Sequence, residues 1–368
     1  MRFHHKNAGF TLIEVLVSAG IVVVLMVVLL GMTDQTQRMV RSTSAKVEQF
    51  QEARVAFESM TRHLSQATLN TFWDYDNPTK PTKYIRAAEL RFRSDSMKNL
   101  TGGTGPNGNP QPSHGVFFQA PLGVVDPMIN PSLRPLDHLI NTWGYFVEIG
   151  SDADKLPTFL KNTVEPRKRY RLMELMQPSE QLGIYTPSSQ VPTISTWFAL
   201  SVKAATNRPV RVLAENIVAL IVLPRLSVAD EELWKKLTKS KTAPILAPNY
   251  QYDSSNPANK QNSDPLLNTL NQIPPVVQVV MVAIDEPSAQ RLEDRFGSDP
   301  YLGINYAPDQ LSSSTLFADP ASLDDSTSGK KGDLTKIQES LVSKKLSYRI
   351  FSTNVSIRGA KWSRSQVN

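Results

Sequence analysis

Residues 9–32 read GFTLIEVLVSAGIVVVLMVVLLGM, and this stretch decides how the chain begins to fold. Its only ionisable side chain is Glu14, and valine and leucine dominate it. At about 1.5 Å of rise per residue, a helix over 10–32 is long enough to cross a hydrocarbon core of about 30 Å. The basic residues Arg2 and Lys6 precede the run. Because basic flanks stay cytoplasmic, the sequence predicts one membrane helix with the rest of the chain on the other side.

Glu14 is the unusual residue of this run. A carboxylate in a membrane helix costs about 2.5–3.5 kcal/mol at the helix centre and less near an end, so it points to a function. If the chain is cut after Gly9, the new amino group lies on Phe10, four residues before Glu14. That amine in one subunit can neutralise the Glu14 carboxylate of a neighbour in a helical assembly. The alternative is a plain signal anchor whose glutamate lies among the lipid headgroups.

The small residues of this region precede the apolar run. A cleavable secretory signal places its small-residue cut site after an apolar stretch of about 7–15 residues. Here Ala8 and Gly9 come before the apolar stretch. Cleavage at this point removes the basic leader and keeps the membrane helix.

The residues around this cut site resemble the prepilin-type N-terminal cleavage and methylation motif of type IV pilins and type II secretion pseudopilins. The matching residues are Gly9, Phe10, Thr11, Leu12, Ile13 and Glu14. The resemblance implies that a prepilin peptidase cuts between Gly9 and Phe10 and that the new Phe10 amine is methylated. It also implies that the motif serves assembly, with other pilin or pseudopilin subunits and inner-membrane lipid as partners of the N-terminal helix. A plain signal anchor explains the motif less well, since a glutamate within a membrane span is disfavoured.

Helical character continues beyond the membrane segment. Apolar residues recur on one face at spacings of three and four, namely Phe50, Ala53, Phe57, Met60, Leu64 and Ala67. No proline occurs before Pro78, so the pattern predicts one helix over 10–69. Its second half is expected to pack this seam on a globular domain. The alternative, a free coiled coil, is less suitable because only about three heptads are present.

After residue 77 the pattern changes to short strands and loops. The predicted strands are 88–93, 116–119, 143–149, 169–175, 196–202, 210–223 with a break near Asn216, 276–284 and 348–358. Two short helices are predicted, over 230–237 with Ser227 or Asp230 as N-cap and over 334–346. The largest predicted loops are 101–113, 247–265 and 309–333.

A helix followed by strands indicates the α+β class. The predicted fold is a long N-terminal transmembrane α-helix, like the spine of a pilin, packed on a C-terminal antiparallel β-sheet domain with long loops. The predicted organisation is a prepilin leader peptide over 1–9, a transmembrane helix over 10–32, a soluble continuation of that helix over 33–70 and a β-rich globular domain over 71–368.

A second resemblance lies in the C-terminal half. The stretch 212–220 reads VLAENIVAL, and a later strand at 274–282 reads PPVVQVVMV. This order is similar to that of the J-type minor pseudopilins of type II secretion and the W-type minor pilins, whose final strand the ending at 348–358 also resembles. The chain is longer than the J type, and it resembles the large prepilin-like proteins of the Verru_Chthon cassette protein C group.

Composition and motifs argue against several kinds of active site. The chain has 368 residues, no cysteine and a formal net charge of +6. The missing cysteine excludes disulfides, thiolate metal sites and a cysteine nucleophile. The basic residues are dispersed, so no nucleic-acid partner is expected. The sequence contains no phosphate-binding loop, serine nucleophile elbow or His-Glu-x-x-His motif. We therefore expect no enzyme, no catalytic residue, no cofactor and no metal ion.

A few isolated residues have a possible chemical role. His63 is expected on the exposed face of the long helix. Asp74, Asp76 and Asn77 offer oxygens to a cation, but a calcium site needs six to eight. The tryptophans are expected in the core or at an interface rather than as a platform for bases; they are Trp73, Trp143, Trp197, Trp234 and Trp362.

The sequence thus predicts a minor pilin or pseudopilin subunit, at the tip of a type IV pilus or type II secretion-like pseudopilus or accessory to it. The expected location is the bacterial inner membrane, crossed once, with the C-terminal domain periplasmic or otherwise extracytoplasmic, or a surface filament. The main alternative is a membrane-anchored surface or adhesive module outside any filament. A membrane-tethered enzyme is the third hypothesis.

Overall fold

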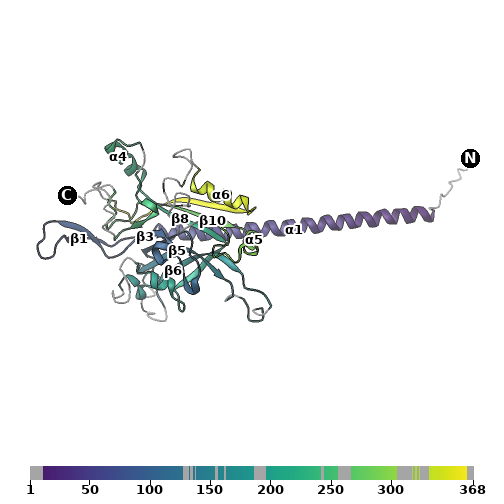
Figure 1. Ribbon diagram of the computed structural model, residues 1–368, viewed down its shortest axis with the longest axis horizontal. Helices are drawn as coiled ribbons and strands as arrows, with labels where there is room; N and C mark the ends of the chain where they lie inside the picture. The colour runs from purple at the N-terminus through teal and green to yellow at the C-terminus, as the bar shows by residue number, and fades with distance from the viewer. Residues whose placement is uncertain are drawn as a thin grey trace, which may run out of the picture. The chain divides into compact units, whose positions relative to one another are not determined.

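A computed structural model describes residues 11–126, 132, 136, 138–153, 156–160, 163–185, 196–241, 244–255, 267–304, 317, 320, 323 and 331–362. The chain divides into two compact units, Met1–Gln49 and Phe50–Asn368, which we call unit 1 and unit 2. Figure 1 shows the helices and strands of both units. Most of the predicted loop 309–333, and residues 256–265 of the predicted loop 247–265, lie outside the described residues.

The first element is the helix α1, Leu12–Leu64, which has 53 residues. Over Leu12–Val40 it is long and apolar enough to cross a membrane, and none of that segment is buried within the chain. The long apolar N-terminal helix is thus confirmed. It ends before the predicted residue 69, because the chain turns at Leu64 and the Thr68 N–H bonds the Gln119 carbonyl at 3.0 Å.

The last turns of α1 belong to the core of unit 2. Ala53, Phe57, Met60 and Leu64 are buried there, as the seam predicted, and Phe50 packs against them. A helix buried on one face is stabilised mainly by this packing, since each fully buried large apolar side chain contributes about 1.5–3 kcal/mol.

A six-stranded antiparallel sheet forms the larger layer of unit 2, in the order β7-β6-β5-β4-β3-β9. Its strands are β3 Arg93–Ser96, β4 His114–Pro121, β5 Ile140–Ser151, β6 Lys168–Gln177, β7 Val210–Glu215 and β9 Tyr252–Asp253. β5 is buried almost throughout, because both faces of the sheet are covered. One face contributes to the main core, which includes the end of α1.

The other face packs on a second apolar cluster. The helices α2, Met97–Thr101, and α3, Ala199–Lys203, contribute to this cluster. Its centre is the stack of Phe117 on Phe198, with ring centroids 3.7 Å apart and planes 3° apart. The edge of Phe198 contacts Trp197, which is buried.

A three-stranded antiparallel sheet, in the order β11-β10-β8, completes the main core. Its strands are β8 Ile217–Arg225, β10 Val276–Ile284 and β11 Tyr348–Ser356. β8 is buried from Ile217 to Pro224, which explains why its sequence is a continuous apolar run rather than an alternating one. The α+β class, with an antiparallel β-sheet domain, is confirmed.

Asn216 joins the two sheets. It separates β7 from β8 and has a φ of 60°, so the predicted break is confirmed. Its N–H bonds the Tyr170 carbonyl on β6 at 2.6 Å, and its own carbonyl accepts from Ile284 on β10 at 3.0 Å. Its side-chain amide donates to Glu286 at 2.9 Å. One residue in a left-handed conformation therefore passes the chain from one sheet to the other.

The remaining elements lie around these layers. The hairpin β1 Thr71–Tyr75 and β2 Tyr84–Ala88 forms a separate two-stranded sheet. The outer helices are α4 Val228–Thr238, α5 Glu286–Phe296 and α6 Asp333–Ser343. Short 3-10 turns lie at Pro106–Gly108, Ser179–Gln181, Gly183–Tyr185 and Pro248–Tyr250. Of the two predicted N-caps of α4, Ser227 is the one found, accepting from the Asp230 N–H at 3.2 Å.

Two predicted strands are wrong. The segment 88–93 lies between β2, which ends at Ala88, and β3, which begins at Arg93. Its N–H groups bond side chains instead of a neighbouring strand, with Gln119 accepting from Arg91 at 2.7 Å. The segment 196–202 forms a turn and α3, because its aromatic residues turn into the second cluster.

His114 is a buried titratable group between the sheets. The Val222 N–H of β8 points at its Nδ1 at 3.4 Å, and its ring lies 4.7 Å from that of Tyr250. Burial lowers the pKa of His114 from 6.5 to about 3. The ring is therefore neutral in the folded chain at every pH above that value.

Substitution of Asn216 tests the corner between the sheets. Asn216→Ala should destabilise the chain by about 2–3 kcal/mol, because alanine is strained at positive φ and the bond to charged Glu286 is lost. Asn216→Gly should cost only about 1–1.5 kcal/mol. Asn207 is exposed at a φ of 50° and provides the control. Asn207→Ala should add only the backbone strain of alanine at positive φ, without the loss of a buried hydrogen bond. Urea unfolding of the detergent-solubilised chain measures the difference, and equal losses for Asn216→Ala and Asn207→Ala would contradict the role of the corner.

Acid should destabilise unit 2 through His114. The unfolded ring takes up a proton near pH 6.5 and the folded ring only near pH 3, so stability is lost as pH falls through this window. Between pH 7 and 5 the loss is about 2 kcal/mol. His114→Gln should remove this part of the pH dependence, whereas the same change at exposed His138 should leave it. Urea midpoints at several pH values check this, and parallel curves for wild type and His114→Gln would disprove it.

Candidate functional site

The predicted processing motif begins α1. Gly9 and Phe10 lie outside the described residues, and Thr11 is the first described residue. The Thr11 N–H and hydroxyl both donate to one Glu14 carboxylate oxygen at 2.9 Å. The Glu14 N–H points back at the Thr11 hydroxyl oxygen at 3.4 Å. This reciprocal pattern is a capping box, with threonine as N-cap and glutamate three residues later.

The capping box gives Glu14 a local partner that our sequence reasoning missed. The spacing Thr-x-x-Glu before an apolar run is its signature and is present at 11–14. The carboxylate also lies at the positive end of the helix dipole, which stabilises negative charge. Among the described residues, only one carboxylate oxygen of Glu14 accepts hydrogen bonds, so the other is open to a further donor.

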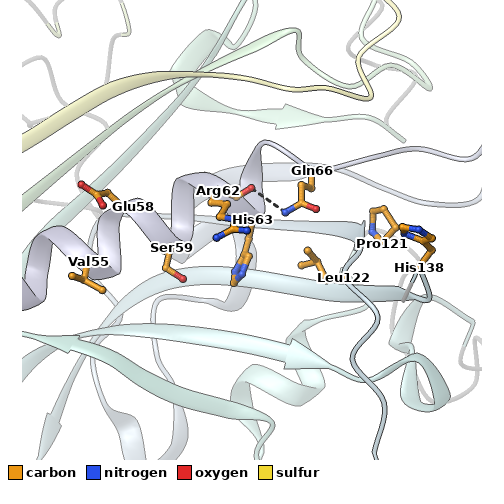
Figure 2. A pocket seen from close by; sticks show the side chains of 9 residues that line it. All are labelled: Val55, Glu58, Ser59, Arg62, His63, Gln66, Pro121, Leu122 and His138. Carbon is orange, nitrogen blue, oxygen red and sulfur yellow. Dashed lines mark hydrogen bonds between the residues drawn. The ribbon is translucent and has the colours of Figure 1, made fainter. Parts of the chain in front are cut away.

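Unit 2 contains a pocket of about 630 Å³ beside the last turns of α1. Figure 2 shows the nine residues that line it: Val55, Glu58, Ser59, Arg62, His63, Gln66, Pro121, Leu122 and His138. The first five come from α1, Gln66 lies in the turn after it, and Pro121 ends β4. The pocket thus combines one face of the helix with the end of a sheet strand.

His63 connects this pocket to a buried polar network. Its Nδ1 lies 2.8 Å from the Tyr145 hydroxyl and 3.7 Å from Glu174. The Tyr145 hydroxyl donates to Glu174 at 2.9 Å, so its oxygen accepts from an Nδ1–H of His63. The ring packs on Trp143 with centroids 4.4 Å apart. The prediction that His63 is exposed is wrong, since its side chain is only 22% exposed.

Glu174 is the buried charge of this network. Burial alone would raise its pKa, but hydrogen bonds from His63, Arg211 and Tyr145 outweigh burial and lower the pKa. Burial, together with the Glu174 carboxylate, raises the pKa of Tyr145 well above its usual value. The carboxylate is thus ionised and fully engaged, which suits a structural anchor for His63.

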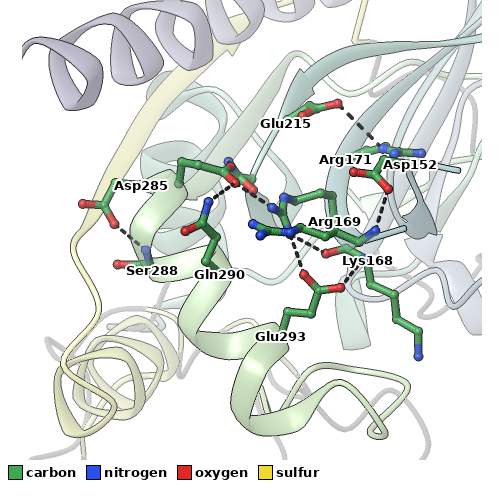
Figure 3. A network of polar contacts seen from close by, with 12 residues as sticks. Asp152, Lys168, Arg169, Arg171, Glu215, Asp285, Ser288, Gln290 and Glu293 are labelled. Atoms are coloured by element: carbon green, nitrogen blue, oxygen red, sulfur yellow. Dashed lines mark hydrogen bonds and ion pairs between the residues drawn. The ribbon is translucent and has the colours of Figure 1, made fainter. Parts of the chain in front are cut away.

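A second polar network fixes α5 to the six-stranded sheet (Figure 3). Arg169 of β6 bonds Glu286 at 2.6 Å and Glu293 at 2.9 Å. The Lys168 N–H also bonds Glu293, at 2.6 Å. A buried arginine whose charge is met by two carboxylates is costly to break, so this network stabilises the position of the helix.

Glu148 of β5 makes a similar contact on the same sheet. Arg208 approaches its two oxygens at 3.0 and 2.6 Å, and Gln111 donates to it at 2.9 Å. The bidentate pair ties Arg208, just before β7, to β5, and the Gln111 bond holds the loop 101–113 against the same strand.

The acidic residues considered for a cation have other partners. Asp76 accepts from the N–H groups of Thr82, Lys83 and Asn77 and from the Thr82 hydroxyl, and these bonds, those from Thr82 first, lower its pKa. In the described part of the chain, no three His, Asp or Glu side chains are grouped to hold a metal ion.

The tryptophans differ in environment. Trp143 and Trp197 are buried, in agreement with the prediction for a core residue. Trp73, on the hairpin, is 59% exposed.

Comparison with known proteins gives one match, at the N-terminus. Residues 4–30 match the family model of the prokaryotic N-terminal methylation motif. No curated protein and no solved structure matches the chain. The chain therefore carries the signal of type IV pilin-like precursors, which a prepilin peptidase processes, and it carries this signal on a helix long and apolar enough to anchor it in a membrane.

Proposed function

We propose that this chain is a minor pilin or pseudopilin subunit, cut between Gly9 and Phe10, methylated on Phe10 and assembled at the tip of a filament or as an accessory to it. The observation that carries the proposal is the single helix α1. It starts in the methylation motif, continues through an exposed apolar segment and ends in the core of a β-sheet domain. Such a helix can anchor the precursor in lipid and later pack among the helices of other subunits.

The strands of unit 2 support the narrower resemblance to J-type minor pseudopilins and W-type minor pilins. The three stretches that carry it, 212–220, 274–282 and 348–358, are separated in sequence. In the structure β8, β10 and β11 take residues from each and pair in one sheet, with Val280 opposite Ile221 and Ser352. The resemblance to the Verru_Chthon cassette protein C group rests on the same strands and on the length of the chain.

A minor position in the filament follows from size. Unit 2 extends from Phe50 to Asn368 and carries a hairpin and three outer helices beyond its two sheets. A domain of this size would crowd a uniform filament. We also infer a structural rather than an enzymatic role, since the buried carboxylates Glu148 and Glu174 are engaged by arginines.

The hairpin favours a second candidate, an anchored adhesive module. It exposes four aromatic side chains and one isoleucine: Phe72, Trp73, Tyr75, Tyr84 and Ile85. Tyr75 and Tyr84 stack with centroids 5.0 Å apart, and Arg86 lies over the Trp73 ring at 5.9 Å. Tryptophan, tyrosine and arginine are the residues that most often dominate binding interfaces. The bonds to Asp76 order the hairpin tip in advance, which reduces the entropy lost on binding.

Processing is tested by mass spectrometry of the membrane fraction. The mature chain should begin at Phe10 and carry one methyl group on its amine. Gly9→Val should leave the chain intact from Met1, because a bulky side chain blocks the cut site, whereas Gly31→Val within α1 should be processed normally. An intact N-terminus in the wild-type chain would disprove the processing.

The Glu14→Ala variant distinguishes the two candidate functions, a filament subunit and an anchored adhesive module. The variant should insert in the membrane normally but co-purify with other pilin-like subunits at least several-fold less, since the neighbour's amine loses its carboxylate. Glu48→Ala removes an exposed carboxylate from the same helix and should have no effect. Unchanged co-purification of Glu14→Ala would contradict the pairing, and a wild-type chain that co-purifies with no such subunit would favour the adhesive module.

A further inference from the structure

The pocket of unit 2 contains one arginine and two histidines. Arg62 is exposed, and no carboxylate among the described residues pairs with its guanidinium. The Nδ1–H of His63 is directed to Tyr145, so its Nε2 can accept a hydrogen bond from a peptide N–H of a ligand. His138 lies at one end of the pocket in Figure 2.

The acidic groups near Arg62 have partners of their own. Glu58 lines the pocket, but Arg54 binds its carboxylate at 2.8 Å. Glu174 lies behind His63, is fully buried and is paired with Arg211. An anion that enters the pocket therefore meets the guanidinium of Arg62, while the carboxylate of Glu58 is held by Arg54.

The other lining residues suit a polypeptide rather than a small ion. Val55, Pro121 and Leu122 provide apolar wall, while Ser59 and Gln66 can bond peptide groups. The volume of about 630 Å³ lies within the range of ligand pockets, about 300–1,000 Å³. An inorganic anion would use the guanidinium but leave the apolar wall in contact with water.

We propose that this pocket binds an acidic segment of a partner polypeptide, with a carboxylate on Arg62 and the adjoining chain against Val55, Pro121 and Leu122. Arginine suits this role because its planar donors match a carboxylate. The site would give unit 2 a contact of its own with a neighbouring protein. It lies wholly within unit 2 and does not depend on cleavage at Gly9, so its failure and that of the proposed processing are distinguishable.

The experiment measures fluorescence anisotropy of a labelled hexaglutamate peptide with the purified, unprocessed full chain in detergent micelles. Wild type should bind it saturably. Arg62→Gln should weaken binding about tenfold, with partial recovery in Arg62→Lys. Ser59→Glu should abolish binding of the peptide, because it places a carboxylate of the chain itself in the pocket. Lys236→Gln removes an exposed cation of α4 and should bind as wild type.

Several outcomes would overturn the proposal. Equal binding by wild type, Arg62→Gln and Ser59→Glu would show that the peptide contacts another surface. Equal affinity for hexaglutamine would remove the role of the carboxylate. Full competition by inorganic phosphate at the same charge concentration would mean that the pocket is a simple anion site.

Discussion

The contact of the α1 seam with the core of unit 2 is the interaction around which the rest of that unit is arranged. Ala53, Phe57, Met60 and Leu64 belong to the same buried cluster as strands of both sheets. The same helix, without a break, is apolar on all sides from Val15 to Met32 apart from Ser18, and this segment is not buried within the chain. A seam on one face suits packing on a protein core, and a segment that is apolar all round suits lipid. The two halves of this single helix are therefore adapted to two different surroundings.

The two sheets depend on each other through a few backbone positions. Asn216 bonds β6 on one side and β10 on the other, so neither sheet edge can shift without breaking a bond at the corner. The end of the chain closes the same core, because the Arg358 N–H bonds the Ser65 carbonyl at 2.9 Å, directly after α1. A Cβ on Gly359 would lie 3.0 Å from the Ala67 carbonyl oxygen, so a side chain there would crowd this closure. First and last elements of unit 2 are thus tied together.

The sequence predicted the helices and strands whose apolar residues recur at regular spacing. It failed where a segment is held by hydrogen bonds to residues far away in the chain. The seam of α1 and the strands within 143–149 and 276–284 follow from apolar spacing alone. Nothing in the segment 88–93 reveals that Asn70, Gln119 and Ser254 accept its N–H groups. The helix α5 could have been predicted from the sequence, since Asp285 is a good N-cap and Pro287 fits the first turn of a helix. The exposure of His63 could not be predicted, because Trp143 and Glu174 reach it only in the folded chain.

The capping box at 11–14 changes how the glutamate in the membrane motif is understood. Its hydrogen bonds from Thr11 need no second subunit, and hydrogen bonds to a charged group are stronger than those between neutral groups. They offset part of the cost of a carboxylate in a membrane helix, which is smaller near the end than at the centre. A lone precursor can therefore hold Glu14 in the membrane before any assembly. Since both Thr11 donors use the same oxygen, the other oxygen is open to an amine from a neighbour. In the proposed subunit, local capping and pairing with a neighbour's amine would be successive uses of one carboxylate.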